Sequence, residues 1–276
     1  VCGLRGHRVT LYEAASRAGG QILLASKVER RREIVGITEW LIAEVEAAGV
    51  EMVFNRLAEA CDVLADEPDV VVIATGGIPN TGFLSNGEEL VTTTWDILGG
   101  TIPPGREVLL FDDNGQHQGL SCAEYLVHAG SRIEILTPDR MIGQEVGGTN
   151  IPAYLRTFYE NGVKMSVNRR LVSVEPEGRR LKARLHNEFT DTGEERVVDQ
   201  VVVEHGTLPV DDLYFELKDS AINRGETDPG ALMEGRLEEP VVNPEGRFHL
   251  FRVGDAVSSR NIHSAIYDSL RICKDL

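Results

Sequence analysis

The sequence predicts an α/β protein made of two nested three-layer domains. Apolar, β-branched segments alternate with segments of helical periodicity, an order typical of parallel sheets covered by helices. The segment VVVEHGTLP (201–209) repeats the pattern of VVIATGGIP (71–79), an apolar strand followed by Gly, two residues and Pro, about 130 residues earlier. A chain of 276 residues is also too long to form a single small hydrophobic core, and is long enough for two domains. We expect an outer domain at 1–98 and 208–276 and an inserted domain at 99–207.

The chain begins like the second half of a βαβ unit. Residues 1–6 are typical of a helix end, with Gly3 and Gly6 in its last turn. The segment 7–12 (HRVTLY) alternates as a strand does and is followed by Glu13. We expect the first strand and its glycine-rich turn to precede residue 1, so we interpret the chain as part of a longer protein.

Periodicity and turn residues define the other elements of both domains. In the outer domain we expect a helix at 33–48, strands at 50–54, 69–75 and 248–253, and a final helix at 262–273. The strand at 69–75 is expected to be buried on both faces. In the inserted domain we expect strands at 107–111 and 132–136 and helices at 119–129 and 151–160. An antiparallel meander should follow from segments 163–168, 171–174, 180–187 and 196–203, with turns at Glu177-Gly178 and Thr192-Gly193.

Composition excludes several classes of function. Lys and Arg total 28 against 44 Asp and Glu, which gives a net charge of −16. Such a surface repels nucleic acid and anionic lipid, and no apolar run approaches the roughly 20 residues of a membrane span. The charged runs 30–32 and 238–239 are expected to be solvated surface.

The four cysteines predict neither a metal site nor disulfides. Cys2, Cys61, Cys122 and Cys273 are widely spaced without a CxxC pair, which argues against zinc or iron–sulfur ligation and fits a reducing cytoplasm. We expect Cys61 and Cys122 to be packed helix thiols. The histidines show no metal-ligand spacing, and no nucleophile–base arrangement is visible.

Four short motifs follow predicted strands and form a candidate nucleotide site in the outer domain. A carboxylate at the position of Glu13 can accept both hydroxyls of an adenosine ribose, or can simply be solvated. Gly19-Gly20 would let backbone approach a ligand closely, or would form an ordinary turn. Thr75-Gly76 and Gly254-Asp255 could equally only end their strands. Their order around an inserted α/β unit is more specific than any one of them.

With these residues the chain resembles the flavoprotein disulfide-reductase superfamily, which has two Rossmann-like domains. The matching segments are VTLYE (9–13), GGQ (19–21), VVIATGG (71–77), GLSCAEYL (119–126) and VGDA (253–256). The segments FDDNGQHQG (111–119) and QEVGGTNIPAYLRTF (144–158) are most similar to the C-terminal half of old-yellow-enzyme-type NADH:flavin oxidoreductases. That family includes trimethylamine and dimethylamine dehydrogenases, N-methylproline and dimethylglycine demethylase-like proteins and 2,4-dienoyl-CoA reductases. The resemblance covers essentially the whole chain.

The resemblance implies cofactors and roles for named residues. It implies FAD or ADP in the outer domain, and FMN with a [4Fe–4S] cluster on an N-terminal (β/α)8 barrel outside this sequence. By this resemblance Glu13 would hold the adenosine ribose, and Asp255, with room given by Gly254, would bind a ribityl or ribose hydroxyl. The residues expected along the pyrophosphate and ribityl are Arg17, Gly19, Gly20, Gln21, Thr75 and Gly76.

The loop that should bind a nicotinamide dinucleotide in the inserted domain departs from the family pattern. Aligning the helix start at Gly119 with a GxGxxG loop puts the other two glycine positions at Asn114 and Gln116. Gln116 places a side chain where backbone should approach a pyrophosphate. Asp112 and Asp113 add two carboxylates, whose repulsion of a phosphate would weaken binding roughly tenfold or more. We therefore expect NAD(P)H not to bind this domain well.

A reductase that takes electrons from NAD(P)H needs this loop, whereas an amine dehydrogenase does not. We therefore expect the chain to belong to an amine demethylase or dehydrogenase that acts on a small methylated amine. The catalytic residues would lie on the barrel, the acceptor could be an electron-transfer flavoprotein, and the intact enzyme is expected to be a homo-oligomer. Two alternatives remain open: an NAD(P)H-dependent enoate or 2,4-dienoyl-CoA reductase, and a non-catalytic module that braces the barrel or docks an acceptor.

Overall fold

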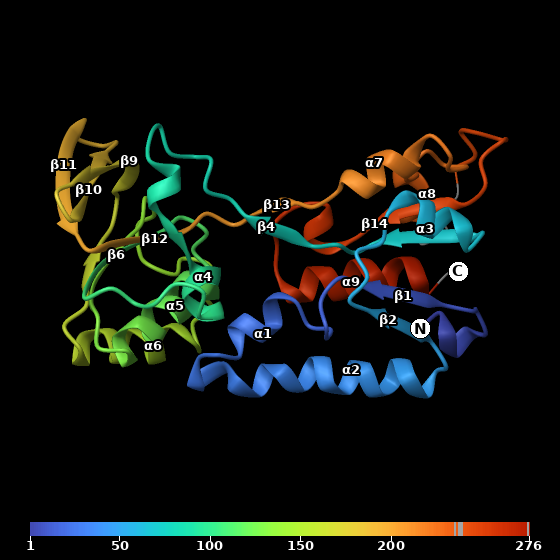
Figure 1. Cartoon of the computed structure of the whole chain (residues 1–276), viewed down its shortest axis with the longest axis horizontal. Helices are drawn as coiled ribbons and strands as arrows, with labels where there is room; N and C mark the ends of the chain where they lie inside the picture. The colour runs from blue at the N-terminus through green and yellow to red at the C-terminus, as the bar shows by residue number, and fades with distance from the viewer. Residues whose placement is uncertain (235, 237–239, 275) are drawn as a thin grey trace. The chain divides into compact units, whose positions relative to one another are not determined.

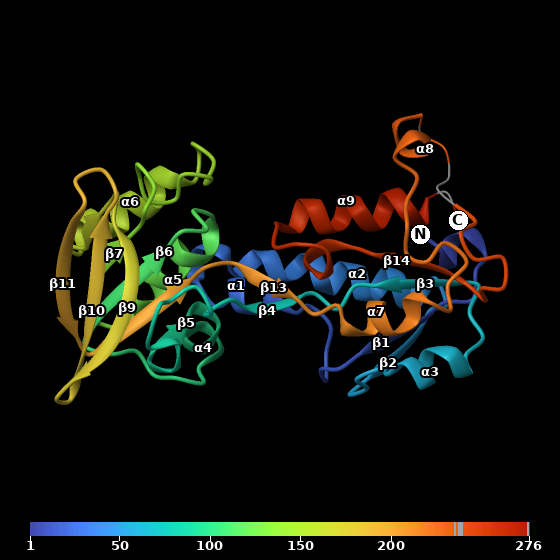
Figure 2. The ribbon, with the colours of Figure 1, turned by 90° about the horizontal axis from the view of Figure 1, so that it is seen from above.

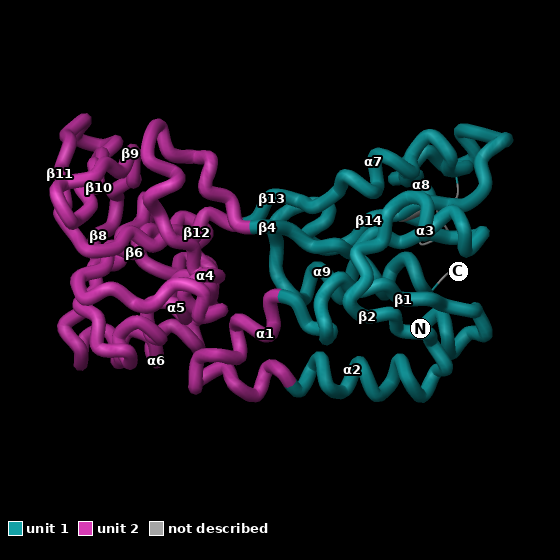
Figure 3. The backbone as a smooth tube through the Cα atoms, in the orientation of Figure 1, with its two compact units in different colours: residues 1–20, 36–78, 207–276 teal, residues 21–35, 79–206 magenta. Residues whose placement is uncertain are grey.

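The computed structural model describes all residues except 235, 237–239 and 275. Glu238 and Glu239, expected to be solvated, therefore lie outside the described residues. The chain forms two compact units, shown in Figure 3: unit 1 comprises 1–20, 36–78 and 207–276, and unit 2 comprises 21–35 and 79–206. The segments 21–35 and 79–98 thus belong to unit 2 by their contacts.

Unit 2 is built on a five-stranded parallel sheet in the order β5-β12-β6-β7-β8. These strands are β5 (Thr92–Thr93), β6 (Glu107–Asp112), β7 (Arg132–Leu136), β8 (Lys164–Ser166) and β12 (Gln200–Glu204). The chain leaves β6 toward β7 on one side, whereas β12 lies on the other side. The carboxyl ends of β6 and β12 therefore meet where the strand order reverses, the usual ligand position in such sheets.

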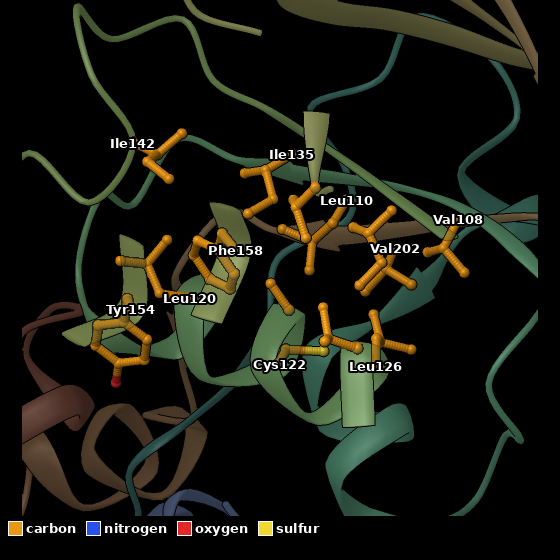
Figure 4. Packing of buried hydrophobic residues seen from close by; sticks show 14 of the residues in the cluster. Val108, Leu110, Leu120, Cys122, Leu126, Ile135, Ile142, Tyr154, Phe158 and Val202 are labelled. Carbon is orange, nitrogen blue, oxygen red and sulfur yellow. The ribbon is translucent and has the colours of Figure 1, made fainter. Parts of the chain in front are cut away.

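Three layers make up unit 2, because alternate side chains of each strand face opposite ways. Val108, Leu110, Ile135 and Val202 pack against α5 (His117–His128) and α6 (Ile151–Glu160), as Figure 4 shows. The opposite face, including Phe111, packs against an antiparallel meander of β9 (Arg170–Glu177), β10 (Arg180–Asn187) and β11 (Thr192–Val198). The helices and the meander lie on opposite sides of the parallel strands in Figure 1, and Figure 2 shows β9, β10 and β11 side by side.

Part of the predicted meander is wrong. Segment 163–168 contains β8, which pairs in parallel with β7. Segment 196–203 is divided at Asp199 between the end of β11 and the fully buried β12. Apolar residues on both sides of Asp199 hid this change of sheet. Thr192-Gly193 begins β11 rather than forming a turn, whereas the turn at Glu177-Gly178 is confirmed, with Gly178 at φ 63°.

Unit 1 contains two separate pairs of parallel strands. β1 (Thr10–Glu13) pairs with β2 (Glu51–Phe54), and β3 (Val70–Ile73) pairs with β14 (His249–Arg252). β3 is buried on one face only, because Val71 and Ile73 are buried and its other residues are half-buried, so the expectation of two buried faces is wrong. The buried core lies around β3 and β14, against α3 (Ala60–Ala65), α7 (Asp212–Lys218) and α9 (Ile262–Cys273).

Both strand pairs of unit 1 have an open edge. The carbonyls of Val9 and Glu13 accept hydrogen bonds from the N–H groups of β2 and of the turn after it, so Thr10 and Tyr12 face the other edge. In the same way Val70 and Val72 face away from β14. Among the described residues no strand pairs with either edge, and both can accept a further strand.

The two repeated segments of the sequence pair with each other where the chain crosses between the units. β4 (Gly77–Pro79) and β13 (Thr207–Pro209) form a two-stranded sheet. Asn80 N–H donates to the Gly206 carbonyl, and Val210 N–H donates to the Gly76 carbonyl, so the strands run in opposite directions. The repeat therefore marks two of the four places where the chain crosses between the units, at residues 78–79 and 206–207.

The remaining helices are short except for α2 (Val35–Ala47). They are η1 (Gly3–Arg5), α1 (Gln21–Ala25), η2 (Glu29–Ile34), η3 (Glu88–Leu90), α4 (Thr94–Gly99), α8 (Pro229–Met233) and η4 (Gly254–Ala256). Across the described residues, every helix falls short of the length or apolarity that a bilayer crossing demands. Cys122 is buried as predicted, but Cys61 is exposed, so its prediction as a packed thiol is wrong.

Candidate functional site

The candidate nucleotide residues of unit 1 follow the carboxyl ends of its parallel strands. Glu13 ends β1, Thr75 and Gly76 follow β3, and Gly254-Asp255 follow β14. Ligands of open α/β sheets bind at this end of the strands. The placement is therefore that of a ligand site, although the strands form two separate pairs.

One group of these residues is the loop after β1. The half-buried Glu13 directs Oε1 back to its own turn, where it accepts a hydrogen bond from the Ala15 N–H at 2.8 Å. Arg17 is exposed, and Gly19 and Gly20 have φ angles of 130° and 47°. Gln21 begins α1 and belongs to unit 2 by its contacts.

The other group gathers around β13. The Thr75 hydroxyl donates to the Val210 carbonyl, and the Gly76 carbonyl accepts a hydrogen bond from the Val210 N–H at 3.0 Å. Asp255 Oδ2 accepts from the Thr207 hydroxyl at 3.2 Å, and its Oδ1 accepts from the Arg260 N–H at 3.1 Å. Thr75 and Asp255 therefore hold the crossing strand and the turn at 255–260 in place.

Sequence reasoning missed the residues that fix this second group. Thr207 holds Asp255, and Asp268 accepts the Gly254 N–H at 3.1 Å and pairs with Arg260. Asp268 lies on α9, 14 residues after Gly254, so only the fold brings the two together.

The residues of unit 1 fit an adenosine phosphate in part. A Cβ atom added to Gly20 or Gly76 would meet no atom within 4 Å, so a ligand can approach the backbone there. Glu13 is the acid expected to hold a ribose, at the end of its strand. Asp255 already accepts two hydrogen bonds from protein, so a ligand hydroxyl would have to share its oxygens.

In unit 2, the dinucleotide loop is occupied by the protein's own carboxyl group. Asp112 ends β6 and is 1% exposed. Its Oδ1 accepts hydrogen bonds from the N–H groups of Asn114 and Gly115 at 3.1 and 3.0 Å. Backbone N–H groups of such a loop are the donors that would otherwise bind a phosphate. Asp112 therefore occupies the hydrogen-bond donors that a ligand's phosphate would use.

Gly119 is required by this arrangement. A Cβ atom at residue 119 would overlap with the Asp112 carboxyl group, which lies directly against the α5 backbone. The third glycine of the loop is thus retained, although here its space is filled by Asp112 rather than left to a dinucleotide.

Burial changes the protonation of this site. Burial first, and then the nearby Glu204 carboxylate, raise the pKa of Asp112 to about 8. Asp112 is therefore mostly protonated at neutral pH. The carboxyl group of Asp112 therefore blocks the loop by occupying it rather than by its charge, whereas Asp113 retains the expected repulsion of a phosphate.

A second polar cluster lies at the end of β12. Glu204 is buried, which raises its pKa, and it accepts hydrogen bonds from Thr94, Asn114 Nδ2 and the Gly206 N–H. His205 Nδ1 lies 2.6 Å from Asp113 Oδ1, and its ring packs 4.2 Å from that of Phe83. The side chains of Asp112, Glu204 and His205 therefore fill the space between the carboxyl ends of β6 and β12, where a ligand of such a sheet would bind.

Comparison with known proteins shows what this chain resembles. It is 47% identical over 276 residues to a probable N-methylproline demethylase of Rhizobium meliloti (strain 1021). It is 44% identical over 286 residues to the N,N-dimethylglycine/sarcosine dehydrogenase of Chromohalobacter salexigens. Each alignment covers 100% of this chain and 41% of the relative, so the chain spans about two fifths of their length. No family model matches the chain.

Solved structures confirm the predicted fold class. Histamine dehydrogenase from Rhizobium sp. 4-9 superposes with a TM-score of 0.78 at 22% identity, over 100% of this chain and 41% of that one. Thioredoxin reductase of T. acidophilum superposes with a TM-score of 0.65 at 17% identity, over 100% of this chain and 91% of that one. The fold is thus that of two Rossmann-like domains of the thioredoxin reductase type. Over its full length the chain is therefore similar to a part of these two longer relatives, a probable N-methylproline demethylase and an N,N-dimethylglycine/sarcosine dehydrogenase.

Proposed function

We propose that the protein carrying this chain is a flavin-dependent amine demethylase or dehydrogenase. In this proposal unit 1 binds FAD or ADP, with Glu13 on the adenosine ribose, and unit 2 binds no nicotinamide dinucleotide. FMN and a [4Fe–4S] cluster belong to the barrel outside this sequence, where a small methylated amine is oxidised. Electrons leave to an acceptor such as an electron-transfer flavoprotein, and the enzyme is a homo-oligomer. The flavin supplies the redox chemistry.

The buried carboxyl group of Asp112 is the observation that carries this proposal. It occupies two backbone N–H groups of the loop that would bind a pyrophosphate, and it lies against the start of α5. A dinucleotide would have to displace it and leave a polar group without its partners, which costs about 1–3 kcal/mol. An enzyme that draws electrons from its amine substrate can carry this loop, whereas an NAD(P)H-dependent reductase cannot.

Anaerobic titration of the purified flavoprotein tests the proposal. We expect N-methylproline, dimethylglycine or sarcosine to bleach the flavin absorbance, and NADH and NADPH to leave it unchanged. Bleaching by NADH together with indifference to methylated amines would instead establish an enoate or dienoyl-CoA reductase. A heat-released extract that contains no FAD, ADP or AMP would show that unit 1 only braces the barrel.

A matched pair of glycine substitutions tests the nucleotide site of unit 1. Gly20 and Gly6 both have positive φ, and an added Cβ would meet no protein atom at either position. Gly20→Ala and Gly6→Ala should therefore each destabilise the protein by about 1–2 kcal/mol, with the larger cost at Gly6, whose φ of 97° is farther from the left-handed region that Ala tolerates. We expect Gly20→Ala alone to weaken ADP binding, about tenfold, because only there does the methyl group enter space that a nucleotide uses. Equal nucleotide content in the two variants would remove this loop from the site.

A further inference from the structure

Unit 2 contains a cavity beside the loop that Asp112 fills. Its volume is about 240 Å³, below the 300–1,000 Å³ typical of drug-sized ligands. Its lining comes from the η2 segment and from the starts of α5 and α6: Arg30, Arg31, Glu33, Ile34, His117, Asn150 and Tyr154. All seven residues belong to unit 2, so the cavity is formed within one compact body.

Arg30 forms a fixed wall of this cavity. Its guanidinium donates to both carboxylate oxygens of the buried Glu124, with Nε 3.2 and 3.1 Å from them, and to the Ala153 carbonyl at 3.1 Å. It also lies over the Tyr154 ring, 5.1 Å from the centroid. Figure 4 shows Tyr154 at the rim of the core with its hydroxyl pointing away from the aliphatic side chains. The charge of Arg30 is therefore neutralised within the protein.

Arg31 differs from Arg30 in this respect. In the part of the chain that the structure describes, its guanidinium forms no ion pair, and its buried Nε has no hydrogen-bond partner. A buried donor without a partner costs about 1–3 kcal/mol, so native proteins rarely leave one. Burial and the charge of Arg31 lower the pKa of His117 to about 4, so His117 is neutral at pH 7. The unpaired positive charge at the cavity is that of Arg31.

Two helices add further positive potential. His117 is the first residue of α5, and Asn150 is the N-cap residue of α6. Neither helix has a side-chain cap or an acidic residue in its first turn, although acids are favourable there. Tyr154 places its hydroxyl 3.2 Å from His117 Nδ1, which adds polar groups to the same wall. The one carboxylate of the lining is Glu33, which is exposed and screened by water.

We propose that this cavity binds an oxyanion group, phosphate or carboxylate, of a small molecule. Arg31 donates to the anion, and the start of α5 stabilises its charge. The cavity is too small for a whole dinucleotide and lies in unit 2, apart from the site expected in unit 1; it borders the end of the loop filled by Asp112, because His117 directly follows that loop. Charge-assisted hydrogen bonds to a guanidinium are among the strongest in proteins, so Arg31 should dominate the affinity.

Anion titrations of the intact flavoprotein test this site. Inorganic phosphate and acetate are added at constant ionic strength, and binding is followed by calorimetry and by the rise in Tm. Wild type should bind at least one of the two anions; whichever binds more tightly shows which group the natural ligand carries. Arg31→Gln should weaken that affinity at least tenfold. Arg32→Gln is the matched control, because it removes the same charge from the next residue, which pairs with Glu29 at the exposed surface.

Asn150→Asp is a second variant for the case that Arg31→Gln does not fold. It places a carboxylate at the N-cap of α6, which favours the helix and repels a bound anion. We expect normal Tm without added anion and loss of the anion-induced rise. Equal anion affinity in wild type, Arg31→Gln and Asn150→Asp, or no binding of either anion to wild type, would overturn the proposal.

Discussion

Replacing Arg30 by Ala is expected to destabilise unit 2 by about 3–5 kcal/mol, the cost of leaving a buried charge without its partner. Glu124 is a residue of α5, and its side chain is only 3% exposed. The Arg30 guanidinium pairs with both of its carboxylate oxygens. Thr157 would remain as a single donor at 3.2 Å. Amide hydrogen exchange of residues 117–128 and 151–160, followed by mass spectrometry, measures the loss in the two helices that this pair connects.

Arg32→Ala is the control for this experiment. Its partner is Glu29, and the two side chains are 65% and 70% exposed, so the expected change is within about 1 kcal/mol. The double variant Arg30→Met/Glu124→Leu should recover most of the stability, because apolar residues of similar size can replace a buried ion pair. If Arg30→Ala and Arg32→Ala have equal effects, the pair does not hold the η2 segment to α5.

Helices with a clear apolar stripe and a stop signal could be predicted residue by residue. The helices at 151–160 and 262–273 have the predicted bounds, because Asn161-Gly162 ends the first, and the second has Ile262, Ile266 and Leu270 at helical spacing. Sheet partners could not be predicted in this way. Segments 163–168 and 196–203 were both predicted as strands of the meander, but β8 pairs with β7, and 196–203 is divided between β11 in the meander and β12 in the parallel sheet. A pairing depends on residues far away in sequence.

The candidate sites show the same division. Glu13, Thr75 and Asp255 were assigned to strand ends from their motifs, and the structure places them there. Their partners could not be read from the sequence, because Thr207, Val210 and Arg260 reach them only through the crossing strand and a turn. The loop after β6 could be recognised from the sequence as departing from the dinucleotide-binding pattern, because Asn114 and Gln116 stand at two of its three glycine positions. That Asp112 turns inward follows from the buried β6, where no neighbouring residue leaves the side chain a route to water.

Asp112→Asn should remove most of the pH dependence of unit 2 stability between about pH 4 and 8. The folded protein raises the pKa of this carboxyl from 3.8 to about 8, mainly by burial. Within that window the native state keeps a proton that the unfolded chain releases, so the free energy of unfolding falls as pH rises. The contribution is fully present below pH 4 and is lost as pH rises through 8. Its limiting slope is about 1.4 kcal/mol per pH unit.

Asn at residue 112 can still accept the N–H groups of Asn114 and Gly115, but it cannot ionise. The variant should therefore match wild type near pH 4 and exceed it by a few kcal/mol near pH 8, with a smaller slope left by Glu204, whose pKa burial also raises. Urea unfolding at a series of pH values, with exchange of residues 117–128 as the probe, measures both curves. Asp62→Asn is the control whose effect on stability has the opposite dependence on pH. Hydrogen bonds from Glu59 N–H and Arg56 lower the pKa of Asp62, so its stabilising contribution is present above about pH 4 and is lost only as the pH falls below 4. Parallel curves for wild type and Asp112→Asn would mean that the carboxyl is ionised in the folded protein, and that charge repulsion, rather than an occupied loop, excludes a dinucleotide.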